Sequence, residues 1–296
     1  MLRGALMDAR RSALNVLRGR QFRGRQRLQQ VLGLNDPGLI PTDERWVDCI
    51  EGLRLTTSTP QDFMFRALYT DGYYQDDVLV ALRNLLSPGM TFFDIGANYG
   101  FMSLYVDRMF QGSVTTVAFE PSPTVLPYLR ENIAENEAVS VSVDDRCISD
   151  TNGSTSFFYS DENSWNATLI VDFASEHGET KVVDVEAVRL DDLVADGARP
   201  DVMKLDVEGA EHLVIRGGQE YLRSAHPAIV AEYNLKGIEG AGLTGDEYLE
   251  LFWSLGYSVS LMPRPVYGWH RWNDRRVVSS ASELPHLCNL VVTEAK

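Results

Sequence analysis

The chain has 296 residues, of which 44% are apolar and 23% charged, the balance of an ordinary globular protein. This length suits one sizeable α/β domain with an appended segment. No run of sequence approaches the ~18 consecutive apolar residues of a membrane span. The formal net charge of −15 argues against a general nucleic-acid binder, because an acidic surface repels a duplex.

Three cysteines, Cys49, Cys147 and Cys288, lie far apart and form no CxxC pair. We therefore expect neither a disulfide framework nor a thiolate zinc site. The first residues also lack the continuous apolar stretch of a secretory signal. Together these features predict a protein of a reducing compartment, the cytoplasm.

Residues 1–30 carry eight arginines and one acidic residue, Asp8, so this segment has a charge of +7 and the remainder −22. Apolar residues recur at spacings of three and four, which predicts an amphipathic helix from residue 1 to about 33. We expect this helix to dock on the body of the protein or on a second subunit of a homo-oligomer. The alternatives are an anionic partner or membrane surface, and a disordered or cleaved leader.

Residues 34–60 contain two proline-bearing turn sequences and are interpreted as a loop-rich connector with one short helical piece. We therefore divide the chain into an N-terminal basic helical arm with its connector, residues 1–60, and a main domain, residues 61–296.

In the main domain short apolar strands alternate with helices, a pattern typical of an α/β fold with a mostly parallel sheet. Strands are expected at 91–95, 114–119, 139–143, 201–206, 228–233, 257–262 and 287–293. Helices are expected at 76–86, 100–110, 123–136, 209–223 and 244–255. A β-rich insertion follows the third strand, with strand candidates at 154–160 and 181–189.

The first of these strands ends at Asp94 and is followed by a glycine-bearing turn, GANYG, at 96–100. Glycine is needed in such a turn because a side chain would keep the backbone away from a ligand. The second strand ends at Glu120, ahead of Pro121 and Ser122, and a carboxylate there can accept two hydrogen bonds from the vicinal hydroxyls of a ribose. Acids at the ends of two successive strands predict a nucleotide-type site.

Two kinds of nucleotide ligand are considered for this site, a dinucleotide and S-adenosylmethionine. A dinucleotide usually rests its phosphates on a GxGxxG turn and a helix amino terminus. Here the turn is GANYG, and no lysine or arginine lies between Asp94 and Asp107. An acid-lined pocket suits a sulfonium and an ammonium better, so we favour S-adenosylmethionine. The alternatives are an NAD(P)-dependent oxidoreductase and a catalytically silent, cofactor-binding assembly protein.

Three motifs resemble those of the FkbM family of class I methyltransferases. They are DIGANYG at 94–100, FEPS at 119–122 and VMKLDVEGAE at 202–211, of which the third is the most specific. The resemblance runs from about Tyr74 to Asn234. It implies a seven-stranded Rossmann-like sheet with helices on both faces, S-adenosylmethionine as methyl donor, and an O-methyl product, often on sugars or polyketide-type acceptors.

The resemblance also implies a set of cofactor contacts. The methionine half would meet the glycine turn, the ribose would meet Glu120, and the adenine would meet the residues after the third strand. The implied set is Asp94, Gly96, Ala97, Asn98, Gly100, Glu120, Pro121, Ser122, Asp145, Arg146, Cys147 and Asp206.

Acidic residues also end the next two strands of the main domain. Asp206 and Glu208 follow one strand, Glu232 and Asn234 end the next, and Lys204 shares a strand face with Asp206. We predict a catalytic cluster of Asp206, Glu232, Lys204 and Glu208. The alternatives are that Asp206 and Glu208 only cap a helix, and that Lys204 is a buried partner of Glu232.

Methyl transfer to a hydroxyl is a direct displacement, so an enzyme mainly aligns oxygen, methyl carbon and sulfur. The hydroxyl must also lose its proton, to a base or with the help of a metal ion. Asp206, Glu232 and Asn234 are hard oxygen ligands at adjacent strand ends and could hold Mg²⁺.

Two aromatic segments, at 165–168 and 267–273, are candidates for the acceptor pocket. Aromatic faces with polar neighbours suit a sugar, whose C–H faces are apolar and whose rim is hydroxylated. We expect a glycan-type small molecule to contact Trp165, Asn166, Trp269 and His270. The alternative is a pair of exposed loops anchored by buried tryptophans.

Overall fold

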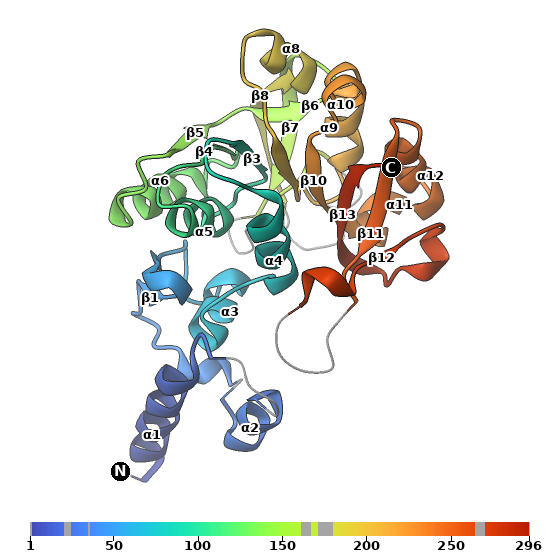
Figure 1. Cartoon of the computed structure of the whole chain (residues 1–296). Coiled ribbons are helices and arrows are strands. Elements are labelled where there is room, and N and C mark those ends of the chain that lie inside the picture. Colours follow the sequence, from blue (N-terminus) through green and yellow to red (C-terminus); the bar gives the residue numbers. More distant parts are fainter. Residues whose placement is uncertain are drawn as a thin grey trace.

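The computed structural model describes residues 2–20, 25–34, 36–160, 167–170, 180–263 and 270–295. Within these ranges a central sheet of eight strands has the spatial order β12-β11-β13-β10-β9-β3-β4-β5 (Figure 1). The strands are β3 (Thr91–Ile95), β4 (Thr115–Phe119), β5 (Val141–Asp144), β9 (Val202–Leu205), β10 (Ala228–Asn234), β11 (Tyr257–Leu261), β12 (Arg276–Val277) and β13 (Leu287–Glu294).

The sheet is mostly parallel. β10, β9, β3, β4 and β5 run in one direction, whereas β13 is antiparallel to both of its neighbours, β10 and β11. All seven strands expected for the main sheet are present, and the two-residue β12 adds an eighth at its edge. The expected α/β, Rossmann-like class is therefore confirmed.

The order of the strands reverses at β3. The chain moves outward from β3 through β4 to β5, and then returns to form β9 on the other side of β3. In open α/β sheets, ligands bind beyond the carboxyl ends of the strands at such a reversal. The topology thus places the ends of β3, β4 and β9 around one crevice.

Helices cover both faces of the sheet, because successive strand residues point to opposite faces. Phe92 belongs to one buried core and its neighbour Phe93 to the other. The first core is covered by α4 (Asp76–Leu85), α5 (Phe101–Met109) and α6 (Leu126–Glu135). The second is covered by α8 (Leu190–Ala195), α9 (Glu211–Gly217), α10 (Gln219–Ala225) and α12 (Gly245–Trp253).

The single helix expected at 209–223 is wrong, because α9 and α10 divide at Gly217 and Gly218. A Cβ atom on Gly217 would lie 1.9 Å from the carbonyl oxygen of Ser149. The helix therefore touches the backbone of β6 (Cys147–Ser149) at this point, a tertiary contact that local periodicity does not reveal.

The β-rich insertion forms a separate three-stranded sheet in the order β6-β8-β7. Its long strands, β7 (Gly153–Tyr159) and β8 (Lys181–Arg189), lie close to their expected positions. The short β6 was not expected. The insertion follows the carboxyl end of β5, and Cys147 and Ile148 of β6 and Phe157 of β7 line the pocket at the carboxyl-end crevice.

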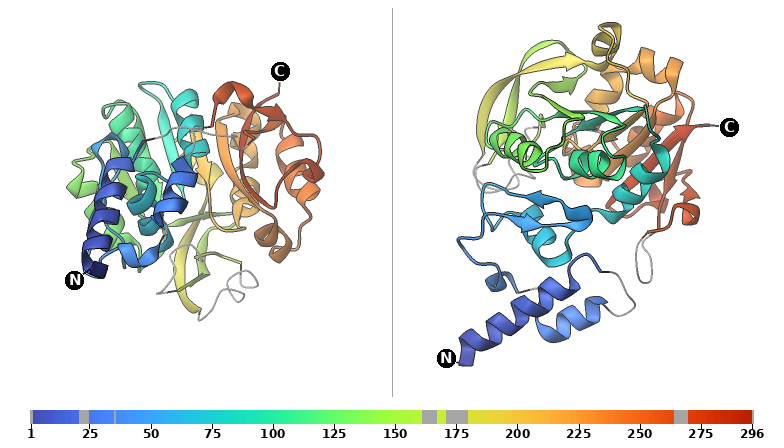
Figure 2. Two further views of the ribbon diagram at one scale, coloured as in Figure 1. Left: turned by 90° about the horizontal axis from the view of Figure 1, so that it is seen from below. Right: turned by 60° about the vertical axis from the view of Figure 1, so that its left-hand side comes forward.

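The N-terminal arm consists of two helices, α1 (Leu2–Leu17) and α2 (Arg25–Leu32), rather than the one expected to reach residue 33. They project from the body on the side of α3 (Figures 1 and 2). The connector contains two short helical turns and a strand pair in place of one helical piece. Its elements are η1 (Pro37–Leu39), β1 (Val47–Asp48), η2 (Ile50–Gly52) and β2 (Arg54–Leu55), followed by α3 (Phe63–Asp71).

Arginines join the two helices of the arm to each other and the arm to α3 through backbone carbonyl oxygens. Nε of Arg10 donates to Leu32 O, and Nε of Arg18 donates to Tyr69 O, each at 2.8 Å. The first contact satisfies a carbonyl at the end of α2, where cations are favourable. Part of the positive charge in this segment thus stabilises the arm.

The last elements are α11 (Leu235–Gly240), η4 (Trp272–Asp274) and η5 (Ala281–Glu283). Among the helices of the described ranges, none combines the length and the apolar character needed to cross a bilayer.

Leu14 on α1 tests whether the arm folds together with the body. Its side chain is 1% exposed and belongs to the same core as Leu68 and Phe92. Leu14→Ala should lower the free energy of unfolding by about 2–5 kcal/mol, because it leaves a cavity in that core. Val16→Ala, at a side chain that is 58% exposed, is the control and should stay within about 0.5 kcal/mol of wild type. Urea unfolding measures both; an unchanged main transition in Leu14→Ala would show an arm that folds separately.

Candidate functional site

A pocket with about 990 Å³ of empty space opens at the carboxyl ends of β3, β4 and β9. One wall is formed by the loops that follow these strands, and another by residues that precede α4 and start α3. The pocket therefore lies where the strand order reverses.

The glycine turn after β3 forms the floor of the pocket. Gly96 has φ +78°, and a Cβ atom there would lie 1.9 Å from the carbonyl oxygen of Asp206. The N–H groups of Gly96 and Ala97 both donate to Phe119 O at 3.0 Å, which ties the turn to the end of β4. Any side chain at position 96 would separate β3 from the loop after β9.

Glu120 is fixed by two backbone donors. Its Oε2 accepts from the N–H of Asn98 at 2.9 Å, and its Oε1 accepts from the N–H of Ser122 at 2.8 Å. Burial raises the pKa of Glu120 to about 7, and these two hydrogen bonds oppose the rise. Each carboxylate oxygen keeps a second lone pair, so the side chain can still accept from a ligand.

Lys204 lies between two acids at the centre of the site. Its Nζ donates to Gly96 O at 3.0 Å and lies 3.4 Å from Oδ1 of Asp94 and 3.3 Å from Oδ2 of Asp206. Burial alone lowers the pKa of Lys204, but attraction to Asp206 and Asp94 outweighs burial and raises it above the ordinary value. The alternative in which Lys204 pairs with Glu232 is therefore wrong.

Asp94 is fully buried, and its Oδ2 accepts from Oγ of Ser103 at 2.6 Å. It lies behind the turn and does not line the pocket. Gly100 and Ser122 do not line it either: Gly100 is the N-cap of α5, and the N–H of Ser122 donates to Glu120. These three residues support the pocket wall from outside.

The residues after β5 separate into two groups. Arg146 and Cys147 line the pocket, whereas the side chain of Asp145 is 62% exposed and pairs with Arg130 at 3.3 Å. Arg146 forms a fork with Asp144, at 2.9 and 2.6 Å. Of the implied cofactor contacts, those that line the pocket are Gly96, Ala97, Asn98, Glu120, Pro121, Arg146, Cys147 and Asp206.

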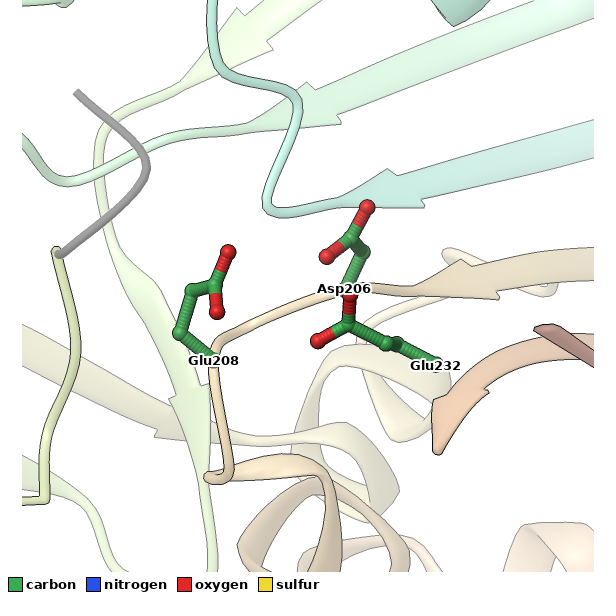
Figure 3. A group of neighbouring side chains, drawn as sticks. All are labelled: Asp206, Glu208 and Glu232. Carbon is green, nitrogen blue, oxygen red and sulfur yellow. The ribbon is translucent and has the colours of Figure 1, made fainter. Parts of the chain in front are cut away.

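Three carboxylates face one another where β9 and β10 end, as Figure 3 shows. One oxygen from each of Asp206, Glu208 and Glu232 lies within 4.8 Å of the other two. Burial, followed by repulsion from neighbouring carboxylates, raises the pKa values of Glu208 and Glu232 well above their ordinary range. We call these three side chains the acid cluster.

The turn that carries Asp206 and Glu208 is held by Glu211, which the sequence did not single out. Oε1 of Glu211 accepts from the N–H of Val207 at 2.8 Å and of Gly209 at 3.4 Å. α9 begins only at Glu211, and no side chain caps its first turn. Asp206 and Glu208 are therefore not the caps of this helix. The signal for Glu211 was present as the last acid of the DVEGAE motif.

Residues before α4 also reach the site, and no sequence motif marked them. Nε2 of Gln75 donates to Oδ2 of Asp206 at 3.4 Å. Tyr74 lines the pocket beside Phe63, with the two rings edge to face at 6.1 Å. Gln75, Asn98 and Glu208 all have positive φ, a conformation that costs non-glycine residues energy and that concentrates at functional sites.

The residues expected to bind the acceptor are only partly described. Trp165, Asn166 and Trp269 lie outside the described residues. His270 is described, but its Nδ1 lies 2.9 Å from Oδ2 of Asp76 and it does not line the pocket. Asn234, expected as a metal ligand, uses Oδ1 to accept from the N–H of Gly237 at the start of α11.

Glu211 generates a prediction about stability. Burial raises its pKa from the ordinary value of 4.5 to about 7, so it is more readily protonated in the folded chain. The free energy of unfolding that arises from this raised pKa is fully present below about pH 4.5, and it is lost as the pH rises through 7. Glu211→Gln should therefore reduce the slope of the free energy of unfolding against pH. Between pH 5 and 7 the slope should fall by up to about 1.4 kcal/mol per pH unit. Chemical unfolding across this range, with the exposed Glu220→Gln as control, measures it; an unaltered slope would contradict the prediction.

Comparisons with known proteins agree with this geometry. The methyltransferase FkbM domain model matches residues 94–259. The chain is 30% identical over 234 residues to methyltransferase sdnD of Sordaria araneosa, covering 69% of this chain and 85% of that protein. It is 28% identical over 215 residues to 31-O-demethyl-FK506 methyltransferase FkbM of Streptomyces tacrolimicus, covering 58% and 77%.

Among solved structures, the chain is similar to methyltransferase FkbM from Methylobacillus flagellatus KT, at 12% identity and a TM-score of 0.44. The match covers 98% of this chain and 58% of that chain. The family model alone spans more than half of the sequence and contains the glycine turn, Glu120 and the acid cluster. The chain belongs to the FkbM family of S-adenosylmethionine-dependent methyltransferases.

Proposed function

We propose that this protein transfers the methyl group to a hydroxyl of a sugar-containing or other small acceptor, and so is an O-methyltransferase. The observation that carries the proposal is that two members of the acid cluster share one pocket with the glycine turn: Asp206 and Glu208 line it together with Gly96 and Glu120, whereas Glu232 lies behind them. A methyl donor and a proton acceptor would thus lie within reach of the same acceptor oxygen.

The pocket offers the cofactor both hydrogen-bond acceptors and an apolar wall. Oδ1 of Asn98 is buried and accepts no hydrogen bond from any residue that the structure describes, so a donor on the ligand would satisfy it. Glu120 offers its remaining lone pairs to ribose hydroxyls, and Cys147, Ile148 and Phe157 provide a largely apolar wall for the adenine. S-adenosylmethionine supplies an electrophilic methyl group on a sulfonium.

We assign the proton transfer to Asp206. Lys204 and Gln75 approach the same oxygen, Oδ2, at 3.3 and 3.4 Å and so orient the carboxylate. Lys204 is not the base, because attraction to Asp94 and Asp206 keeps it protonated. As the acceptor oxygen attacks the methyl carbon, its proton passes to the Asp206 carboxylate.

The acceptor itself would lie against the wall that precedes α4. Phe63, Met64 and Tyr74 make this wall apolar, while Gln75 adds an amide at its edge beside Asp206. An acceptor with an apolar face and a hydroxylated rim suits such a wall, as a sugar or a polyketide-type molecule does. The relative from Streptomyces tacrolimicus is named for 31-O-demethyl-FK506, which supports O-methyl transfer in this family.

Cofactor binding provides the first test. Glu120→Ala should weaken binding of S-adenosylhomocysteine by on the order of 1.5–3 kcal/mol, the effect of losing hydrogen bonds to a charged group. Isothermal titration calorimetry measures the loss, with Glu220→Ala on the exposed surface of α10 as control. Unchanged affinity in a folded Glu120→Ala protein would remove Glu120 from the site, and tight NADH binding in place of S-adenosylhomocysteine would contradict the assignment of the pocket.

Turnover provides the second test, with an acceptor found by screening hydroxylated small molecules for methyl transfer. Asp206→Asn should reduce turnover by at least ~100-fold, because the acceptor hydroxyl loses its proton acceptor. Asp201→Asn is the matched control: Asp201 lies at the opposite end of β9, where Oδ2 accepts from the N–H of Thr91. Near-normal turnover in Asp206→Asn would refute the role of Asp206. A wild-type protein that binds the cofactor but methylates nothing in the screen would favour the silent assembly protein.

A further inference from the structure

We propose that Asp206, Glu208 and Glu232 bind one divalent cation, and that this cation holds the acceptor hydroxyl at the methyl donor. This inference rests on the proposed O-methyl transfer. The ligand set differs from the one expected from the sequence, because Glu208 takes the place of Asn234. One oxygen from each of the three carboxylates lies within 4.8 Å of the other two.

Glu232 gives an observation independent of this grouping. Its side chain is 8% exposed, and its Oε2 is buried without a hydrogen-bond donor among the described residues. Figure 3 shows this carboxylate directed toward Asp206 and Glu208. A buried carboxylate oxygen without a partner is costly, whereas a cation at this point would satisfy it.

The protein itself supplies too little positive charge for the cluster. Lys204 is the cation beside it, and its Nζ is already shared among Gly96 O, Asp94 and Asp206. Glu208 and Glu232 form no salt bridge with any residue in the described ranges. One lysine, with a single positive charge, therefore lies beside two of the nearby acids, and a divalent ion would supply positive charge to the other two.

The ligands indicate which kind of ion binds. All three are carboxylates, the hard oxygen ligands that Mg²⁺, Mn²⁺ and Ca²⁺ prefer. Oxygens on opposite sides of such an ion lie about 4.2–5 Å apart, given metal–oxygen distances of about 2.1–2.5 Å. The three oxygens of the acid cluster all lie within 4.8 Å of one another, which is inside the span of about 5 Å for the longer of these metal–oxygen distances.

An open coordination sphere would define the class of acceptor. Three protein oxygens leave about three of six positions free for water and acceptor oxygens. Two adjacent free positions suit an acceptor with neighbouring oxygens, such as a vicinal diol or an α-hydroxy ketone. A hydroxyl bound to the cation also loses its proton more readily, and the proton could then pass to a cluster carboxylate or to water.

Binding of Mn²⁺ to the full chain tests the proposal directly. After removal of metals with EDTA, electron paramagnetic resonance should report one bound Mn²⁺ per chain. Glu232→Gln and Glu208→Gln should each weaken Mn²⁺ binding at least tenfold, because each removes a charged ligand. Glu239→Gln, at an exposed position on α11, is the control and should bind Mn²⁺ as wild type does. Glu208 is less buried than Glu232, so its variant remains informative if Glu232→Gln fails to fold.

Calorimetry with S-adenosylhomocysteine on the same samples separates this proposal from the proposed function. Cofactor binding without stoichiometric Mn²⁺ binding would overturn the cation site and leave the methyltransferase assignment intact. Mn²⁺ binding that survives both substitutions would also overturn the site, because the ion would then bind elsewhere. Mn²⁺ binding that the two variants lose, in a protein that binds no cofactor, would support the cation site and contradict the proposed function.

Discussion

The ion pairs of Lys204 are the interaction on which the rest of the site depends. Its ammonium group contacts Asp94 at the end of β3, Asp206 at the end of β9, and the carbonyl of Gly96 between them. A buried charge of this kind is stable only when its partners are well placed. One side chain therefore sets the spacing between the glycine turn and Asp206.

A second constraint is the close approach of backbones at the same place. Gly96 lies so near the carbonyl of Asp206 that a single methyl group would separate the two loops. The N–H groups of Gly96 and Ala97 donate to the end of β4, and that of Asn98 donates to Glu120. Hydrogen bonds thus join the glycine turn, Glu120 and the end of β4, an arrangement that would favour catalysis by alignment.

The surplus of negative charge at this unit links stability to function. Glu211 and Glu232 are buried and Glu208 is half-buried beside Asp206, and removal from solvent raises the pKa of each. Such a cluster is costly for folding at neutral pH, and the raised pKa values measure that cost. The same carboxylates would attract a sulfonium, an ammonium or a divalent cation, so the groups that are costly for folding include those proposed to bind.

Local patterns in the sequence determined the strands, their flanking turns and the acids that end them. Alternating and continuous apolar runs specify β3, β4 and β9, and a strand's last residue must lie at the sheet edge whatever the rest of the chain does. Only the tertiary structure decided where those side chains point: Asp94 turns away from the pocket to Lys204, Asn234 caps α11, and Gln75 reaches Asp206 across 131 positions of sequence. The physical reason is that such contacts depend on the packing of segments far apart in the chain, which no periodicity within a segment encodes.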